Sequence, residues 1–273
     1  MKFDMHCHTK EGSIDAKVPV EEYIGLLKEQ GFGGMLITDH DSYKGYRAWY
    51  KTVKGKKHRD FVVLRGIEYD TRNGGHILVI LPEGVHLPIL EFRGMPVQLL
   101  IRMVHHYGGI LGPAHPFGER HMSFVTTQWA IKKRRRGMDR ILKQFDFIEI
   151  YNACESEERN AKAEKLANRY EKPGFGGSDS HKSDCVGTGY TILPDWIRRE
   201  SDLIRYVKKK PEILCGGTGY FKTVKGSLGF FLSMYAKMFF WYNHFGALFH
   251  GNNRKRELKK DDNWDTDKKL WFE

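Results

Sequence analysis

The chain of 273 residues has few cysteines, and it lacks the closely spaced cysteine pairs that are typical of disulfide-rich secreted domains. Its four cysteines, Cys7, Cys154, Cys185 and Cys215, lie far apart in the sequence. No apolar segment of signal-peptide length precedes Asp4 either. Cysteines with these spacings are typical of proteins in reducing compartments. We therefore expect free thiols and a cytoplasmic protein.

The composition favours a folded domain over a disordered chain. Hydrophobic residues make up 40% of the sequence, which is enough for one sizeable domain with its own core and an appendage. Lys and Arg number 45 against 34 Asp and Glu, so the formal net charge is +11. This excess favours polyanionic substrates or anionic surfaces. Part of it lies in local runs, such as residues 132–136 and 254–260, which can equally be solvated surface.

Four short segments carry side chains that bind metal ions: DMHCH at residues 4–8, TDHD at 38–41, PAHP at 113–116 and SDSH at 178–181. Imidazole and carboxylate together suit Zn²⁺, Mn²⁺ or Fe²⁺, whereas calcium and magnesium sites are built mainly from oxygen atoms. Alternate residues of a strand share a face, so His6 and His8 can bind one ion while Cys7 points away and Asp4 supports them from behind. The pattern predicts a metallohydrolase.

These segments follow predicted strands that alternate with predicted helices. Strands are expected at residues 35–38, 61–64, 77–81, 145–150, 190–193 and 212–215, and helices at 19–30, 97–107, 201–209 and, capped by Ser156, up to about Tyr170. Glu68 follows the second of these strands, and His76 opens the third. Functional side chains at successive strand ends are typical of a parallel barrel whose active site lies at one mouth. We therefore predict an α/β fold, specifically a distorted TIM-like barrel.

The motifs resemble those of the PHP-domain family, which is named after its polymerase and histidinol phosphatase members, over about residues 1–220. The resemblance implies a distorted (β/α)₇ barrel that binds two or three divalent ions of Mn²⁺, Zn²⁺ or Fe²⁺. The ligands it implies are His6, His8, Asp15, His40, Glu68, His76, His115, Asp179 and His181. The sequence around Asp15 departs from the family's usual one. Asp15 as a turn or cap residue and His76 as a solvent-facing residue remain alternative interpretations.

The activity implied by the resemblance is metal-dependent hydrolysis of phosphoesters. Bound ions lower the pKa of water from about 15.7 toward about 7 and neutralise charge on a phosphoryl group. Glu68 is implied as a bridging ligand, and Asp179 as the residue that orients the attacking water. His181 could protonate a leaving group, although metal binding takes precedence for it. Asp39 and Asp41 are interpreted either as supports of His40 or as surface turn residues.

The substrate is less well determined by the sequence. Arg120 and His121 are predicted to bind a substrate phosphate, with a solvated surface role as the alternative. The resemblance and the basic, aromatic-rich composition favour a phosphorylated small molecule or nucleotide, such as a nucleoside 3′,5′-bisphosphate, or a short RNA. Histidinol phosphate, phosphotyrosine and amide hydrolysis stay open. So does a non-catalytic, metal-stabilised scaffold that binds nucleic acid or membrane, and the oligomeric state is left undetermined.

Residues 221–273 are predicted to form an aromatic and basic helical extension to the barrel domain of residues 1–220. Residues 228–249 are mostly apolar, but Lys237, Asn243 and His244 would be costly at the centre of a bilayer. A helix that lies in the membrane interface, flanked by the basic residues 254–256, is therefore favoured over a spanning helix. Peripheral membrane contact through residues 228–256 and packing on the barrel or on a partner subunit both remain open.

Overall fold

The computed structural model describes residues 1–53, 57–118, 122–129 and 135–220, and all of these belong to one compact unit, residues 1–226. The predicted C-terminal extension, residues 221–273, and the candidate substrate residues Arg120 and His121 lie outside the described residues. Within the described ranges, no helix is both long and apolar enough to cross a membrane.

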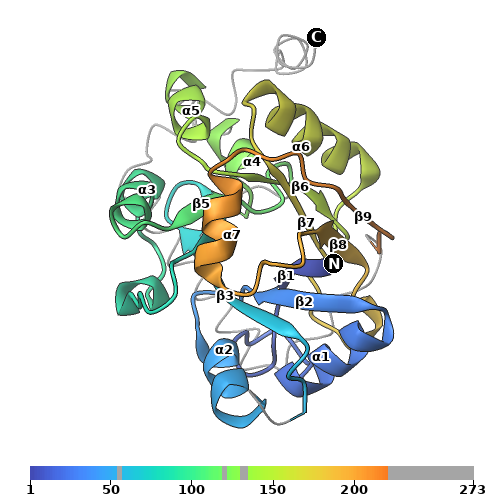
Figure 1. Ribbon diagram of the computed structural model, residues 1–273. Helices are drawn as coiled ribbons and strands as arrows, with labels where there is room; N and C mark the ends of the chain where they lie inside the picture. The colour runs from blue at the N-terminus through green and yellow to red at the C-terminus, as the bar shows by residue number, and fades with distance from the viewer. Residues whose placement is uncertain (54–56, 119–121, 130–134, 221–273) are drawn as a thin grey trace, which may run out of the picture. The chain divides into compact units, whose positions relative to one another are not determined.

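The described residues contain nine strands, most of which belong to a barrel-like arrangement (Figure 1). They are β1 (Lys2–Cys7), β2 (Phe32–Ile37), β3 (Val62–Thr71), β4 (Gly75–Ile80), β5 (Ile110–Pro113), β6 (Ile148–Asn152), β7 (Gly174–Gly177), β8 (Gly189–Ile192) and β9 (Cys215–Gly217). One sheet has the order β5-β4-β3-β2-β1-β8-β9, and β6 pairs with β7 in a second. Asp179 N–H donates to His6 O after β7, and Asp146 N–H donates to Leu111 O before β6. These bonds join the second sheet to both β1 and β5, so strands β1 to β7 surround a common interior.

In the part of the chain that the structure describes, the α-helices between the strands are α1 (Val20–Glu29), α2 (Lys44–Ala48), α3 (Val97–His106), α4 (Phe124–Trp129), α5 (Arg135–Leu142), α6 (Glu157–Arg169) and α7 (Glu200–Val207). The helices α1, α3, α6 and α7 lie where the sequence pattern predicts them. Ser156 caps α6 by accepting a hydrogen bond from Arg159 N–H. The sequence pattern predicted no helix at α2, α4 or α5, which have five, six and eight residues.

The barrel is not uniformly parallel, because β4 pairs antiparallel with both β3 and β5. Only residues 72–74 separate β3 from β4, and a connection this short can join antiparallel strands but cannot bring the chain back for a parallel pairing. As a result, the first residues of β4 lie at the same end of the barrel as the last residues of β1, β2 and β3. This reversal places His76 at that end.

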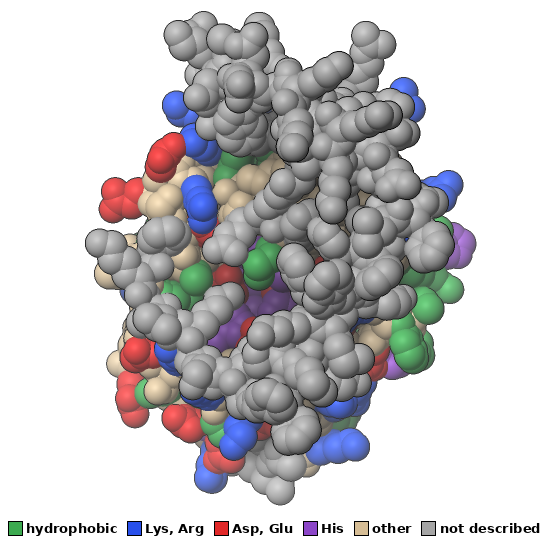
Figure 2. Space-filling view, turned by 180° about the vertical axis from the view of Figure 1, so that it is seen from behind, with side chains coloured by type: hydrophobic (Ala, Val, Ile, Leu, Met, Phe, Trp, Pro, Cys, Tyr) green, Lys and Arg blue, Asp and Glu red, His purple; other side chains and the backbone are tan. Residues whose placement is uncertain are grey.

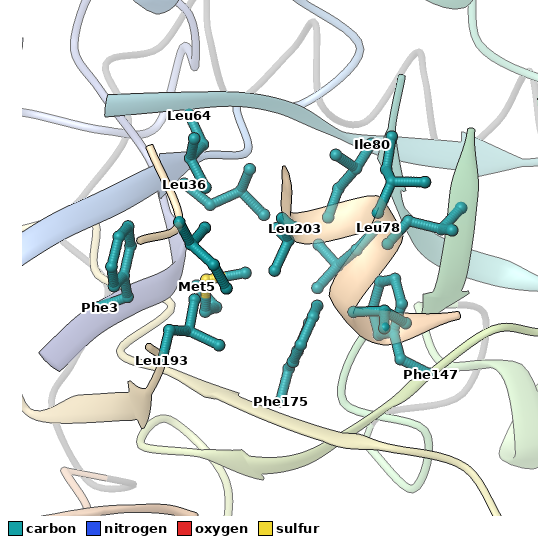
Figure 3. Close-up of a cluster of buried hydrophobic side chains, with 14 of the residues drawn as sticks. Phe3, Met5, Leu36, Leu64, Leu78, Ile80, Phe147, Phe175, Leu193 and Leu203 are labelled. Atoms are coloured by element: carbon teal, nitrogen blue, oxygen red, sulfur yellow. The ribbon is translucent and has the colours of Figure 1, made fainter. Parts of the chain in front are cut away.

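Apolar side chains from several strands fill the barrel interior (Figure 3). Phe3 and Met5 of β1 meet Leu64 of β3 and Phe175 of β7 in this core. Helix α7 packs against one end of the core with Leu203, Ile204 and Val207, all of them buried. Burying a side chain of this size stabilises the fold by about 1.5–3 kcal/mol. Because apolar side chains fill the interior, the polar side chains of a functional site gather at the end of the barrel opposite α7.

Candidate metal centre

The nine predicted metal ligands come together at the barrel end opposite α7. His6 and His8 lie at the end of β1, His40 follows β2, Glu68 lies within β3, His76 lies in β4, His115 follows β5, and Asp179 and His181 follow β7. Asp15 comes from the loop between β1 and α1. Figure 2, which is viewed from behind Figure 1, shows histidine side chains at the floor of a hollow on this face.

Glu68 occupies the middle of the cluster, and its side chain is only 1% exposed. Five imidazoles have a nitrogen within 3.3 Å of its carboxylate: His76 Nδ1 (2.9 Å) and His115 Nε2 (3.1 Å) at Oε1, and His40 Nδ1 (3.0 Å), His6 Nε2 (3.3 Å) and His8 Nε2 (3.3 Å) at Oε2. Burial alone would raise the pKa of Glu68, but the imidazoles of His76, His6 and His40 hold that pKa well below its usual value. Glu68 is therefore an ionised carboxylate surrounded by potential ligands.

The outer side of the cluster is more open to solvent. Asp15 Oδ2 lies 3.2 Å from His181 Nε2 and 3.8 Å from His40 Nε2, and the Asp15 side chain is 31% exposed. Burial opposes ionisation of Asp15, but the hydrogen bond with His181 and the charge of His40 lower its pKa. Asp179 Oδ1 lies 3.1 Å from His8 Nε2, so it joins this side to the buried part. Asp15 is therefore the most exposed of the nine predicted ligands.

Glu149 fixes the orientation of His6 from behind the cluster. Its Oε1 lies 2.8 Å from His6 Nδ1, and its Oε2 accepts hydrogen bonds from His115 N–H (2.5 Å) and Asn152 Nδ2 (3.2 Å). This contact holds the ring so that His6 Nε2 faces Glu68 Oε2 at 3.3 Å. The sequence interpretation did not assign Glu149. The signal for it was a carboxylate within a strand whose neighbours Phe147 and Ile148 are apolar.

A second support holds His8 through Ser13 and Asp39. The Ser13 hydroxyl donates to Asp39 Oδ1 (3.2 Å) and lies 3.2 Å from His8 Nδ1, so it accepts from that nitrogen and leaves Nε2 facing the cluster. Ser13 Oγ also accepts from His40 N–H (3.0 Å). Asp39 therefore supports His40 through Ser13 and the surrounding loop. A Cβ at Gly12 would lie 1.9 Å from Asp39 Oδ2, so this loop needs glycine for its close approach.

Strained backbone conformations gather at the same rim. His115 has φ +27°, Asp41 has φ +46° and Asp179 has φ +51°, in the region that residues with a Cβ rarely adopt. Two of these residues are predicted ligands and the third directly follows His40. Such conformations persist only where the surrounding contacts hold them, and they occur preferentially at functional sites.

The donor set fits divalent metal ions. Three groups of ligand atoms each lie within 4.8 Å of one another: His6, His8 and Glu68; His40, Glu68 and His76; and His8, His40 and His181. Among the described residues, the buried atoms Glu68 Oε2 and Asp15 Oδ1 accept no hydrogen bond, so a cation would satisfy them.

Comparison with known proteins gives a family match over most of the barrel. A family model described as "PHP domain" matches residues 4–170, and one described as "PHP-associated" matches residues 157–210. The chain is 22% identical over 162 residues to a PolC-type DNA polymerase III from Thermotoga petrophila. That match covers 53% of this chain but only 12% of the polymerase, so the chain spans a small part of that relative's length.

Two solved structures have a similar fold. A protein from Bifidobacterium adolescentis assigned as a metal-dependent phosphoesterase superimposes with a TM-score of 0.52 and 14% identity, over 76% of this chain and 96% of that one. A lesion-specific endonuclease from Pyrococcus furiosus superimposes with a TM-score of 0.54 and 15% identity, over 78% of this chain and 57% of that one. At these identities the likeness concerns the fold.

Proposed function

This chain belongs to the PHP-domain family, and from that membership we propose that it is a metal-dependent phosphoesterase, a hydrolase that acts on ester bonds. The observation that carries the proposal is the buried carboxylate of Glu68 with five imidazoles within 3.3 Å of it. Burying a charged carboxylate costs free energy, and buried charges in proteins are paired or coordinate metal ions. A cluster of titratable groups of this kind is typical of a functional site.

Each group of ligand atoms has a place in this proposal. His6, His8 and Glu68 would hold one ion, and His40, Glu68 and His76 a second, which makes Glu68 the bridging ligand. His8, His40 and His181, with Asp15 nearby, form a third group, but this group shares His8 and His40 with the first two, and because a neutral imidazole has one lone pair it would be an alternative position for an ion. His115 Nε2 lies 3.1 Å from Glu68 Oε1, the oxygen that His76 also faces. When bound, such ions activate water and neutralise charge on a phosphoryl group.

The protein groups around the ions would position the reacting atoms. Asn152 Nδ2 donates to Asp179 Oδ2 (3.2 Å), which fixes the carboxylate with Oδ1 toward His8. Asp179 is thereby held in one orientation and is the proposed partner of the attacking water. His181 Nε2 faces Asp15, so the primary role proposed for His181 is that of a ligand.

The proposed substrate is a phosphorylated small molecule or nucleotide, such as a nucleoside 3′,5′-bisphosphate, or a short RNA. The net charge of +11 supports an anionic substrate, and the fold is shared with an endonuclease. The open side at Asp15 and His40, with side chains 31% and 21% exposed, is where a phosphate would approach. Arg120 and His121 remain predicted phosphate-binding residues outside the described ranges.

The experiment is phosphate release in the presence of Mn²⁺ with and without chelator. The substrates are a nucleoside 3′,5′-bisphosphate, short oligoribonucleotides, histidinol phosphate and a phosphotyrosine peptide. Asp184→Ala is the matched control for Asp179→Ala, because Asp184 is an exposed aspartate five residues further on. We expect chelator-sensitive release that Asp179→Ala abolishes and Asp184→Ala retains. If the protein binds Mn²⁺ but releases no phosphate from any substrate, the result favours the scaffold role over catalysis.

A further inference from the structure

Tyr220 connects the chain beyond β9 to the loops that follow β6 and β7. Its backbone N–H donates to Ala153 O (2.7 Å) after β6. Its hydroxyl lies 2.6 Å from Ser178 O and 2.8 Å from Asp179 O after β7. Both carbonyls can only accept, so the hydroxyl proton is shared between them. A residue far along the chain from the motifs thus contacts the backbone of a predicted metal ligand.

The carbonyl of Asp179 also determines which nitrogen of His181 faces the cluster. His181 Nδ1 lies 3.0 Å from Asp179 O, so Nδ1 must carry a proton, and the ring is turned so that Nε2 faces Asp15 Oδ2 at 3.2 Å. The same residue has φ +51°, a conformation that needs support from its surroundings. Tyr220 and His181 therefore donate to one carbonyl in a strained turn that carries two predicted ligands.

We propose that Tyr220 is a positioning residue for the metal centre. Its hydroxyl holds the turn of residues 178–181 so that the Asp179 carboxylate and His181 Nε2 face the ions together. Without the hydroxyl, Ser178 O loses a hydrogen bond, and the left-handed conformation of Asp179 loses one of its supports. The inference deepens the proposed function and rests on it, because it assumes that these side chains bind metal.

The test is Tyr220→Phe, which removes only the hydroxyl and keeps both the ring and the bond from the backbone N–H to Ala153 O. Residues that orient metal ligands typically change metal affinity by about 10- to 100-fold when they are replaced. We expect a loss of about this size in Co²⁺ and Mn²⁺ affinity, measured by competition with a chromogenic chelator, and an altered Co²⁺ absorption spectrum. The matched control is Tyr170→Phe, which removes a hydroxyl that donates to Asp139 Oδ1 (2.7 Å) at the far end of α6.

A second variant separates positioning from general stability. Para-aminophenylalanine at position 220 restores a donor on the same ring, so it should recover the affinity and the Co²⁺ spectrum. Wild-type affinity in Tyr220→Phe, or no recovery with the amino group, would overturn the inference. Urea unfolding of the metal-free variants shows whether each one is folded at the assay temperature. If the wild-type protein itself binds no metal, the proposed function fails, whereas an unchanged Tyr220→Phe removes only the role of Tyr220.

Discussion

Replacing Glu149 with glutamine should weaken metal binding while the barrel stays folded. Glutamine keeps the shape of the side chain but replaces one carboxylate oxygen with a donor. Two buried donors meet Glu149 at different oxygens, His6 Nδ1 (2.8 Å) at Oε1 and His115 N–H (2.5 Å) at Oε2, where Asn152 Nδ2 (3.2 Å) also donates. Either orientation of the amide therefore places its NH₂ group against a donor. If it faces His6, the imidazole can relieve the conflict only by moving its proton to Nε2, the nitrogen that must bind the metal.

The size of the effect follows from the number of unpaired donors. One buried donor left without an acceptor costs about 1–3 kcal/mol, which corresponds to roughly a 5- to 150-fold loss when it is expressed in metal affinity. Any part of this cost that does not reduce metal affinity should appear as a lower free energy of unfolding of the metal-free protein. Glu149→Ala would leave both donors unpaired, and the larger loss would approach the total stability of a typical domain, so glutamine is the better probe.

The assay combines chelator competition for Mn²⁺ or Zn²⁺ with urea unfolding of the metal-free protein. Glu158→Gln on the neighbouring helix α6 is the matched control, because the Glu158 side chain is 75% exposed and pairs with Lys162. Replacing such a surface residue should change stability by less than about 0.5 kcal/mol and leave metal affinity unaltered. If Glu149→Gln binds metal as tightly as the wild type, and is as stable, the argument from donors and acceptors is wrong.

Three further outcomes are expected. Asp179→Ala or His8→Ala should abolish turnover with the circular dichroism spectrum retained, and near-wild-type rates in either variant would remove the proposed site. Chelation should lower the melting temperature in scanning fluorimetry by roughly 5–10 °C per site, since free metal at about 100 times its Kd stabilises the fold by about 2.7 kcal/mol; an unchanged value contradicts metal binding to the native state. Gly12→Ala, whose Cβ would meet Asp39, should lower the free energy of unfolding measured in urea by about 1–3 kcal/mol. A Cβ at Gly25 in α1 would meet no atom within 4 Å, so Gly25→Ala should raise the free energy of unfolding by about 0.5–1 kcal/mol. Equal effects of the two substitutions would refute the close packing of Gly12 against Asp39.

The parts of the fold that could be predicted are those that depend on local pattern. The apolar residues Val20, Tyr23, Ile24 and Leu27 recur at helical spacing, and they form the buried face of α1. The strand expected at residues 145–150 is less well placed, because β6 begins at Ile148 and extends to Asn152. Phe145 and Phe147 are both fully buried, and burial alone makes an apolar segment look like a strand before the ladder begins.

The reversal of β4 shows what local pattern leaves undecided. A parallel barrel places functional residues after its strands, whereas His76 lies near the start of β4. The turn at residues 72–74 is short enough to imply that β4 runs antiparallel to β3. The pairing of β4 with both β3 and β5 is what places His76 Nδ1 2.9 Å from Glu68 Oε1. A ligand assigned from its residue type thus reaches the cluster because of strand direction.

The sequence by itself predicted which side chains could bind metal and that they lie at strand ends, because both depend on residue type and on spacing along a short segment. Only the tertiary structure decided what stands behind those ligands. Glu149 is 143 residues from His6, and Tyr220 is 41 residues from Asp179. Hydrogen bonds between residues so far apart leave no periodic signal in the chain, since their partners meet only when the strands surround one interior. The same closure sets which nitrogen of His6 and of His181 faces the centre of the cluster, and the sequence alone gives no indication of that orientation.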